Sequence, residues 1–166
     1  MGLFKFIKSA GEKLFGSAEE EKKIEAEVRS YPDAAENLEQ LKRARALQLR
    51  VVALGLTVDG LQVDVDGGKV TLRGKVEDQQ TSEKVALAAG NVNGVEAVDN
   101  QLTVVKTEPE ATFYTVVSGD TLSKIAKTHY GNAMKYPAIF EANKPMLTHP
   151  DKIYPGQVLR IPPLAE

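Results

Sequence analysis

The two histidines are the side chains in this chain of 166 residues that first suggest catalysis or metal binding. His129 and His149 are too few and too far apart for a zinc site, and the sequence contains no cysteine that could add thiolate ligands. Neither histidine lies beside a serine in a nucleophile elbow. We therefore interpret both as surface or capping residues.

Carboxylates offer one further candidate, because Asp64 and Asp66 precede Gly67-Gly68 in the manner of a calcium-binding loop. The remaining oxygen ligands and the closing glutamate are missing, so a tight hairpin turn accounts better for these residues. The sequence also lacks a phosphate-binding loop, a dinucleotide fingerprint and a pair of catalytic carboxylates. We predict a binding protein and not an enzyme.

The composition is that of a globular protein, with 42% hydrophobic residues and a formal net charge of −2 at pH 7. The small net charge and the lack of a basic stripe argue against nucleic acid as a partner. The longest apolar run, 51–56, is far shorter than the roughly 20 residues needed to cross a bilayer, so we expect no transmembrane segment. The absence of cysteine suits a reducing compartment.

The chain begins with MGLFKFIKSAGEKLFG, which combines apolar and basic side chains. Lys5, Lys8 and Lys13 interrupt every stretch that could be the apolar region of a signal peptide, so we expect this segment to be retained. Its apolar residues recur at near-helical spacing. This spacing predicts an amphipathic helical arm over 1–16, broken at Gly11.

Two helices are expected after the arm. Ser17 is the expected N-cap of the first, which is rich in charge and ends at Tyr31-Pro32. The second runs from Asp33 to Leu54 with a buried apolar stripe and is capped near Gly55. We interpret residues 17–39 as a charged helical insert.

A β-hairpin is expected next, because apolar residues alternate with polar ones over 61–65 and again over 69–76. The intervening Asp66-Gly67-Gly68 is a tight-turn signal. The two strands can therefore pair directly.

The chain then returns through a helix over 79–89, closed by Gly90-Asn91, to a strand over 98–104. The order helix, strand, strand, helix, strand, with the turn GNVNGV, resembles the BON domain. This resemblance implies an α/β sandwich over residues 40–105.

The last part of the chain follows a polar segment, 106–112, which contains proline and is interpreted as a linker. It contains YTVVSGDTLSKIA, YGN, IFEAN and IYPGQVLRIP, and these motifs resemble the LysM domain, which implies a small βααβ unit over 113–162. Asp120 is expected to cap its first helix, and Pro155-Gly156 to turn the chain into its last strand. The expected fold class is α+β.

The LysM resemblance also implies a shallow groove for N-acetylglucosamine polymers. Its edges are assigned to Gly119, Asp120, Thr121, Leu122, Ile153, Tyr154 and Pro155. Such a groove would suit an envelope protein anchored to peptidoglycan. The lack of an export signal favours instead a LysM domain that packs or acts as a scaffold, and both interpretations are kept.

A cation site without side-chain ligands is a further interpretation. Helix ends leave carbonyl oxygens unpaired, and glycine lets the chain turn so that these oxygens face one space. Gly11 and Gly90 mark two such ends. A ring of neutral carbonyls suits a large monovalent cation, whereas calcium and magnesium prefer carboxylates. Most glycine-capped helices bind no ion, so this pattern alone leaves the question open.

Four motifs, MGLFKFIKSAGEKLF, GNVNGV, IFEANKPML and PDKIYPGQVLRIP, are together similar to the cytoplasmic potassium-binding proteins of bacteria, which combine BON and LysM domains. The likeness leaves out the stretch around 18–39. It implies reversible binding of potassium, with rubidium and caesium also accepted, and a more ordered BON domain when the ion is bound. The implied ligands are the main-chain carbonyls of Ile7, Ala10, Glu12, Gly90, Val92 and Val95.

We therefore expect a cytoplasmic, monomeric ion sensor or buffer that binds potassium through the BON domain and the arm. The LysM domain would support or relay the change, and the downstream protein partner is left open. An envelope protein that binds peptidoglycan is the second hypothesis. A third hypothesis places the amphipathic arm on a membrane surface, because its lysines and phenylalanines suit an interface.

Overall fold

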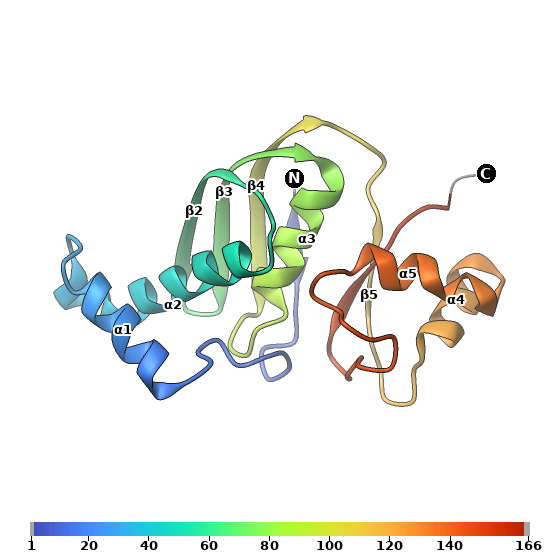
Figure 1. The fold of residues 1–166 in the computed structure, drawn as a ribbon, viewed down its shortest axis with the longest axis horizontal. Coiled ribbons are helices and arrows are strands. Elements are labelled where there is room, and N and C mark those ends of the chain that lie inside the picture. Colours follow the sequence, from blue (N-terminus) through green and yellow to red (C-terminus); the bar gives the residue numbers. More distant parts are fainter. Residues whose placement is uncertain (1, 165–166) are drawn as a thin grey trace.

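A four-stranded sheet carries helices on one face and adjoins a smaller unit with its own two-stranded sheet (Figure 1). These elements come from a computed structural model that describes residues 2–164. The first domain contains β1 (Leu3–Lys5), α1 (Ala18–Val28), α2 (Ala34–Ala53), β2 (Asp59–Asp66), β3 (Lys69–Asp78), α3 (Gln79–Gly90) and β4 (Ala97–Lys106). The second contains β5 (Thr112–Thr115), α4 (Leu122–Tyr130), the 3-10 helix η1 (Ala133–Lys135), α5 (Tyr136–Ala142) and β6 (Val158–Ile161). The expected α+β class is confirmed.

The large sheet has the strand order β1-β4-β3-β2. β2 and β3 form the expected antiparallel hairpin, with Gly67 at a positive φ of 58° in the turn. β3 and β4 are parallel, and α3 is the crossover between them. Alternate strand residues are buried against α2 and α3, so this face of the sheet holds the main core.

The amino-terminal arm is not the expected amphipathic helix. Leu3, Phe4 and Lys5 form β1, which pairs antiparallel with the edge of β4. The prediction failed because Leu-Phe-Lys-Phe has strand alternation as well as helical spacing: Leu3 and Lys5 are exposed, whereas Phe6 is buried. The unpaired backbone groups of β4 decide between the two, since a strand satisfies them and a helix does not.

The charged helix α1 packs antiparallel on α2, as the neighbouring ribbons in Figure 1 show. Ile24 and Val28 bury themselves against Ala46, and Leu14 and Phe15 from the arm pack on the same small cluster. The expected N-cap of α1 is present, because the Ser17 hydroxyl accepts a hydrogen bond from the Glu20 N–H at 3.1 Å. The helix pair therefore anchors the end of the arm.

The second domain has the expected βααβ order, with η1 between its two helices. Its α4 begins differently from the prediction, which placed Asp120 at the cap. The Thr121 hydroxyl accepts the hydrogen bond from the Lys124 N–H, whereas Asp120 accepts from the Tyr114 hydroxyl and the Val117 N–H. A cap side chain must reach the N–H two or three residues on, and Thr121 lies one residue closer to the helix than Asp120.

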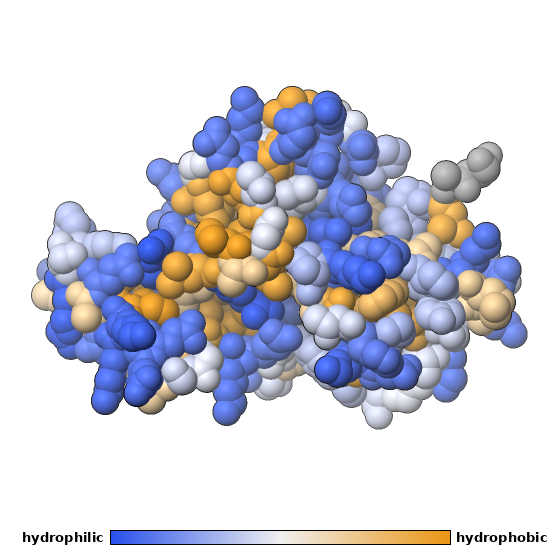
Figure 2. Space-filling view, in the orientation of Figure 1, coloured by the Kyte–Doolittle hydropathy of each residue, from blue (hydrophilic) through white to orange (hydrophobic). Residues whose placement is uncertain are grey.

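Hydrophilic side chains cover most of the face drawn in Figure 2, and hydrophobic ones gather over the first domain. Within residues 2–164, none of the helices has both the length and the apolar character required to cross a bilayer.

Candidate functional site

A loop between α3 and β4 forms one half of the candidate site. Asn91 ends α3 by donating its N–H to the Leu87 carbonyl at 2.9 Å. The chain then turns sharply, with Val92 and Val95 buried and Gly94 at a positive φ of 96°. The core residues Val92 and Val95 thus fix the course of a loop whose backbone is otherwise irregular.

The amino-terminal arm forms the other half of the site. β1 leads it along β4, and the Phe6 N–H donates to the Glu96 carbonyl at 2.8 Å. The Phe6 ring then covers Gly90 so closely that a Cβ at Gly90 would overlap it. Only glycine at the end of α3 leaves room for this aromatic side chain.

Main-chain hydrogen bonds join the arm and the loop beyond Phe6. The Gly94 N–H donates to the Lys8 carbonyl at 2.7 Å. The Glu12 N–H donates to Asn91, and the Glu12 carbonyl accepts from the Asn93 N–H at 2.8 Å. These bonds join the arm backbone to the loop backbone, and the Asn93 side chain adds one more by donating to the Ser9 carbonyl at 3.2 Å.

Gly11 lies at the closest approach of the two segments. Its φ is +101°, and an added Cβ would lie 2.7 Å from the carbonyl carbon of Asn91 and 2.8 Å from the Val92 nitrogen. Both groups are backbone, so they have little freedom to move aside. A side chain at this position would separate the arm from the loop.

The six residues implied as ion ligands lie on these two touching segments: Ile7, Ala10, Glu12, Gly90, Val92 and Val95. Glu12 and Val92 form a direct β-bridge. The carbonyls of Ile7, Glu12 and Val92 each accept one backbone hydrogen bond. A carbonyl oxygen has two lone pairs, so each of these can still face a cation. Their role as ligands remains a prediction.

The charges around this backbone cluster leave its carbonyls as the main polar groups. The Glu12 carboxylate is paired with the Arg50 guanidinium at 2.8 Å, and Arg50 also donates to the Ala88 carbonyl. Among residues 2–164, no group of three histidine, aspartate or glutamate side chains is placed to hold a metal ion. The arrangement thus offers neutral oxygen atoms and no acidic cage.

The second domain packs directly on both segments. The Asn91 side chain donates to the Val158 carbonyl at 2.8 Å and accepts from the Val158 N–H at 2.9 Å. A Cβ at Gly156 would lie 2.5 Å from the Ala10 Cβ, which shows how closely the turn before β6 approaches the arm. Two residues beside implied ligands, Asn91 and Gly11, therefore lie within or next to this domain contact.

Comparison with known proteins agrees with this architecture. The family models of the BON domain and the LysM domain match residues 39–106 and 114–162. Over 163 residues the chain is 43% identical to the potassium binding protein Kbp of Escherichia coli, an alignment that covers 98% of this chain and 99% of Kbp. This chain belongs to the Kbp family.

Two further relatives of this Kbp family member are similar to only part of the chain. An uncharacterized protein of Deinococcus radiodurans is 39% identical over 116 residues, which cover 63% of this chain and 44% of that protein. An esterase of Mycobacterium tuberculosis is 49% identical over 53 residues, only 11% of its length.

The groove residues implied for the LysM domain of this Kbp family member are divided among two cavities, the core and the exposed surface, where Gly119 and Pro155 lie. Thr121 and Leu122 line a cavity of about 370 Å³, whose other wall contains His149, Pro150 and Asp151. In the sequence, these three residues come just before 153–155, the predicted second edge of the groove. His149, which we interpreted from the sequence as a surface or capping residue, is exposed there.

The predicted second edge faces elsewhere. Ile153 packs on the LysM core, Pro155 is exposed, and Tyr154 lines a separate cavity of about 280 Å³ together with Gly11 and Glu12. Burial, and then the negative charge of Glu12, raise the pKa of Tyr154 to about 12. Tyr154 therefore belongs to the contact with the arm. Binding of a glycan remains a prediction, which the arrangement of these edges does not strengthen.

Sequence reasoning missed the residues that join the two domains. Asn91 was assigned only as a helix stop and Gly156 only as a turn residue, yet both also make the domain contact. A polar Asn at the helix C-cap was the one local signal, because its side chain remains free for a partner after the backbone has ended the helix.

Proposed function

We propose that this protein binds potassium reversibly through main-chain carbonyls of the BON domain and the amino-terminal arm. The observation that carries the proposal is the direct contact of the arm with the loop after α3, through the bridge between Glu12 and Val92. This contact brings segments bearing all six implied ligands side by side. The name of Kbp, a relative aligned over nearly the whole chain, supports potassium as the ion.

The chemistry of the cluster supports a monovalent ion over a divalent one. Neutral carbonyl dipoles can replace the hydration shell of a large, weakly hydrated cation, and rubidium and caesium share this property with potassium. Calcium and magnesium instead favour carboxylates. The nearby acidic side chain, Glu12, is already paired with Arg50.

In this proposal the protein acts in the cytoplasm as a potassium sensor or buffer. The ion would hold the arm on the BON domain, because its ligands come from both segments. The LysM domain would support that state through its contacts with Asn91 and Ala10. A ligand that binds only this closed arrangement stabilises it by an amount that grows with the logarithm of its concentration above the Kd.

Thermal unfolding in potassium, sodium and choline chloride at equal ionic strength tests the proposal. Potassium should raise the midpoint relative to choline, since an ion that binds only the native state must stabilise it. Deleting residues 2–12 should abolish this rise. Should the deletion prevent folding, Gly11→Ala provides the second variant, because it keeps the arm but disturbs its contact. Equal midpoints in the three salts, or a full potassium response without the arm, would refute it.

A further inference from the structure

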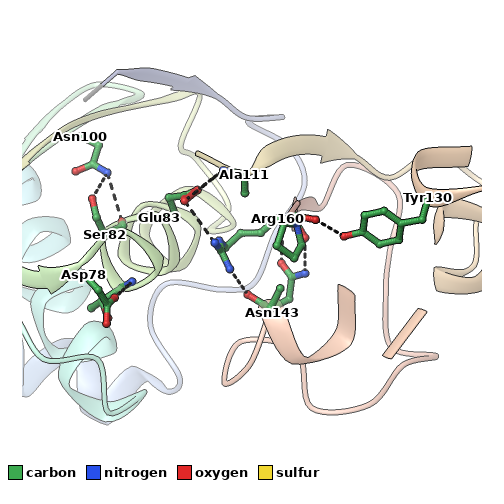
Figure 3. Close-up of polar contacts among 11 residues, drawn as sticks. Asp78, Ser82, Glu83, Asn100, Ala111, Tyr130, Asn143 and Arg160 are labelled. Atoms are coloured by element: carbon green, nitrogen blue, oxygen red, sulfur yellow. Dashed lines mark hydrogen bonds and ion pairs between the residues drawn. The ribbon is translucent and has the colours of Figure 1, made fainter. Parts of the chain in front are cut away.

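The helices α3 and α2 cover different strands of the large sheet. The buried Asn100 side chain of β4 donates to the Ser82 hydroxyl of α3 at 2.9 Å, which holds α3 over the inner strands β3 and β4 (Figure 3). α2 lies instead over β2, the last strand on that side of the sheet (Figure 1). Within residues 2–164, no strand pairs with the outer side of β2. The backbone of β2 therefore forms an open edge next to a helix.

The hairpin decides which backbone groups point to this open edge. The two-residue turn after Asp66 makes Asp66 part of a hydrogen-bonded pair with β3. Hydrogen-bonded pairs alternate along an antiparallel ladder, so Val63 and Val65 direct their N–H and carbonyl groups outward. The Leu61 carbonyl has the same direction, because it accepts from the Gln48 amide of α2 at 3.3 Å. α2 thus covers the start of the edge and leaves the groups of Val63 and Val65 for a partner.

A groove of about 280 Å³ runs between this open edge and α2, and we call it the edge groove. Successive side chains of a strand point to opposite faces, so Val63 and Val65 lie toward α2, whereas Asp64 and Asp66 lie toward solvent. A strand added beside β2 would therefore have one apolar side and one side next to carboxylates. The lining residues are Asn37, Gln40, Leu41 and Ala44 of α2 and Val63, Asp64, Val65 and Asp66 of β2.

The charged side chains that line the edge groove are acidic. Asp66 is exposed and has no ion pair in the described part of the chain, and Asp64 is paired with Arg73 at 2.7 Å. Arg73 belongs to β3, about 4.8 Å farther from the open edge. The neighbouring cations of α2 are held elsewhere, because Lys42 binds glutamates of α1 and α2 and Arg43 donates to a carbonyl of the hairpin turn. A basic side chain on an added strand is therefore favoured, and an acidic one is repelled.

The same carboxylates disfavour a second copy of this chain as the occupant. Two copies of β2 can pair antiparallel only with their outward groups facing each other. A register centred on Asp64 then places Asp64 of one copy opposite Asp64 of the other. A register centred on Val65 places Asp64 opposite Asp66. Like charges directly opposite each other destabilise a strand pair, and acidic side chains on an edge deter association between copies.

We propose that the edge groove binds a partner protein through an extended segment in which apolar residues alternate with lysine or arginine. The segment would add a strand to β2, with its backbone bonded to Val63 and Val65. Its apolar side chains would pack on Leu41 and Ala44, which are half-buried, and its basic side chains would lie beside Asp66. In strand addition of this kind the main chain supplies affinity and alternate side chains supply specificity. The site is independent of the potassium proposal, because its residues lie on other elements.

Amide hydrogen exchange of the intact protein, followed by nuclear magnetic resonance at constant potassium, provides the test. The probe is an acetylated and amidated hexapeptide of three Val-Lys repeats, and the matched control has three Val-Glu repeats. At ten times its Kd the lysine peptide leaves about one site in eleven free, so exchange of the Val63 and Val65 amides should slow about tenfold. The amides of Gln62 and Asp64 face β3 and should keep their rates.

Charge reversal separates recognition at the edge from general attraction between peptide and protein. Asp66→Lys should weaken binding of the lysine peptide about threefold or more and should strengthen binding of the glutamate peptide. Asp151→Lys makes the same change in net charge at an exposed position of the LysM domain. It should leave both affinities as they are in the wild type.

Four results would overturn the proposal. The first is no protection of Val63 and Val65 by the lysine peptide, and the second is equal protection by the glutamate peptide. The third is equal weakening of binding by Asp66→Lys and Asp151→Lys, which would reduce the effect to net charge. The fourth is protection of Val63 and Val65 that rises with protein concentration in the absence of peptide, which would assign the edge to a second copy of the chain.

Discussion

Gly11→Ala is the substitution that most directly probes the contact between the arm and the loop. The residue has a φ of +101°, which alanine adopts only under strain, and its added Cβ would lie 2.7 to 2.8 Å from backbone atoms of Asn91 and Val92. Backbone atoms cannot rotate out of the way as a flexible side chain can. The arm must therefore shift away from the loop, and the proposed carbonyl cluster must open.

Two magnitudes combine in this variant. A residue held in a sparsely populated backbone region costs about 1 to 3 kcal/mol, and the backbone overlap adds to that cost in any salt. The second magnitude concerns potassium alone. At 100 times its Kd a bound ion adds about 2.7 kcal/mol to the free energy of unfolding, which corresponds to about 5 to 11 °C in Tm for a chain of this size. Gly11→Ala should lose most of that second increment.

The assay is the difference in Tm between potassium chloride and choline chloride at equal ionic strength. Two controls separate strain from ion binding. Gly131→Ala carries a positive φ of 74° with no atom within 4 Å of the added Cβ, so it should lower Tm in both salts and keep the potassium increment. Gly2→Ala has neither feature and should match the wild type.

The result is judged by the increase in Tm that potassium produces in each variant, and not by the Tm of the variant itself. If Gly11→Ala melts lower in both salts but keeps the full potassium increment, the arm does not contribute to the ion site and the assignment of Ile7, Ala10 and Glu12 is wrong. Loss of the increment in Gly131→Ala as well would mean that general destabilisation, and not the arm contact, controls the response.

Two further substitutions test the local structure. Asn91→Ala should lower the free energy of unfolding by about 1 to 3 kcal/mol in urea melts, because the buried N–H and carbonyl of Val158 lose their partner, and an unchanged value would contradict the domain contact. Asp78→Ala removes the N-cap of α3, where the carboxylate accepts from the Thr81 N–H at 2.7 Å, and should cost about 1 kcal/mol at neutral pH. That hydrogen bond holds the pKa of Asp78 below its ordinary value, so its stabilisation is complete above the unfolded-state pKa and is lost as the pH falls through the folded-state pKa. The stability gap between Asp78→Ala and the wild type should close in acid, and a gap that widens there would be inconsistent with this sign.

Local patterns were sufficient for most of the fold. The β2–β3 hairpin followed from strict alternation and the turn at 66–68, and α3 followed from its spacing and its stop at Gly90-Asn91. These signals act within a few residues, so sequence alone can contain them. The LysM domain was instead predicted from the resemblance of its motifs to that family.

The arm shows where local pattern fails. Its residues fit a helix and a strand, and the choice depends on the free edge of β4, almost 100 residues later in the chain. Asp120 shows the same failure on a small scale. It has the right chemistry for a cap, but the Tyr114 hydroxyl and the Val117 N–H occupy it in the folded chain.

The candidate ion site is harder still to predict from residues, because every residue has a carbonyl and the side chains do not identify the ligands. The two glycines were the only local signal of the site, and the contacts that require them come from distant parts of the chain. Gly90 is required by the ring of Phe6, and Gly11 by the backbone of Asn91. The ligand set came from the family resemblance, and the residues themselves indicated only where two chain segments could approach each other.

Asn91 gives the proposed function a physical link between the ion and the LysM domain. Its carbonyl accepts from Glu12 in the arm, and its side chain pairs with Val158 in β6. If potassium orders the arm against this loop, it also orders the residue that holds the LysM domain. Coupling between two binding equilibria is reciprocal. The LysM contact must then raise potassium affinity by the same factor by which potassium strengthens the contact, so a domain without ligands of its own can still set the concentration at which the protein responds.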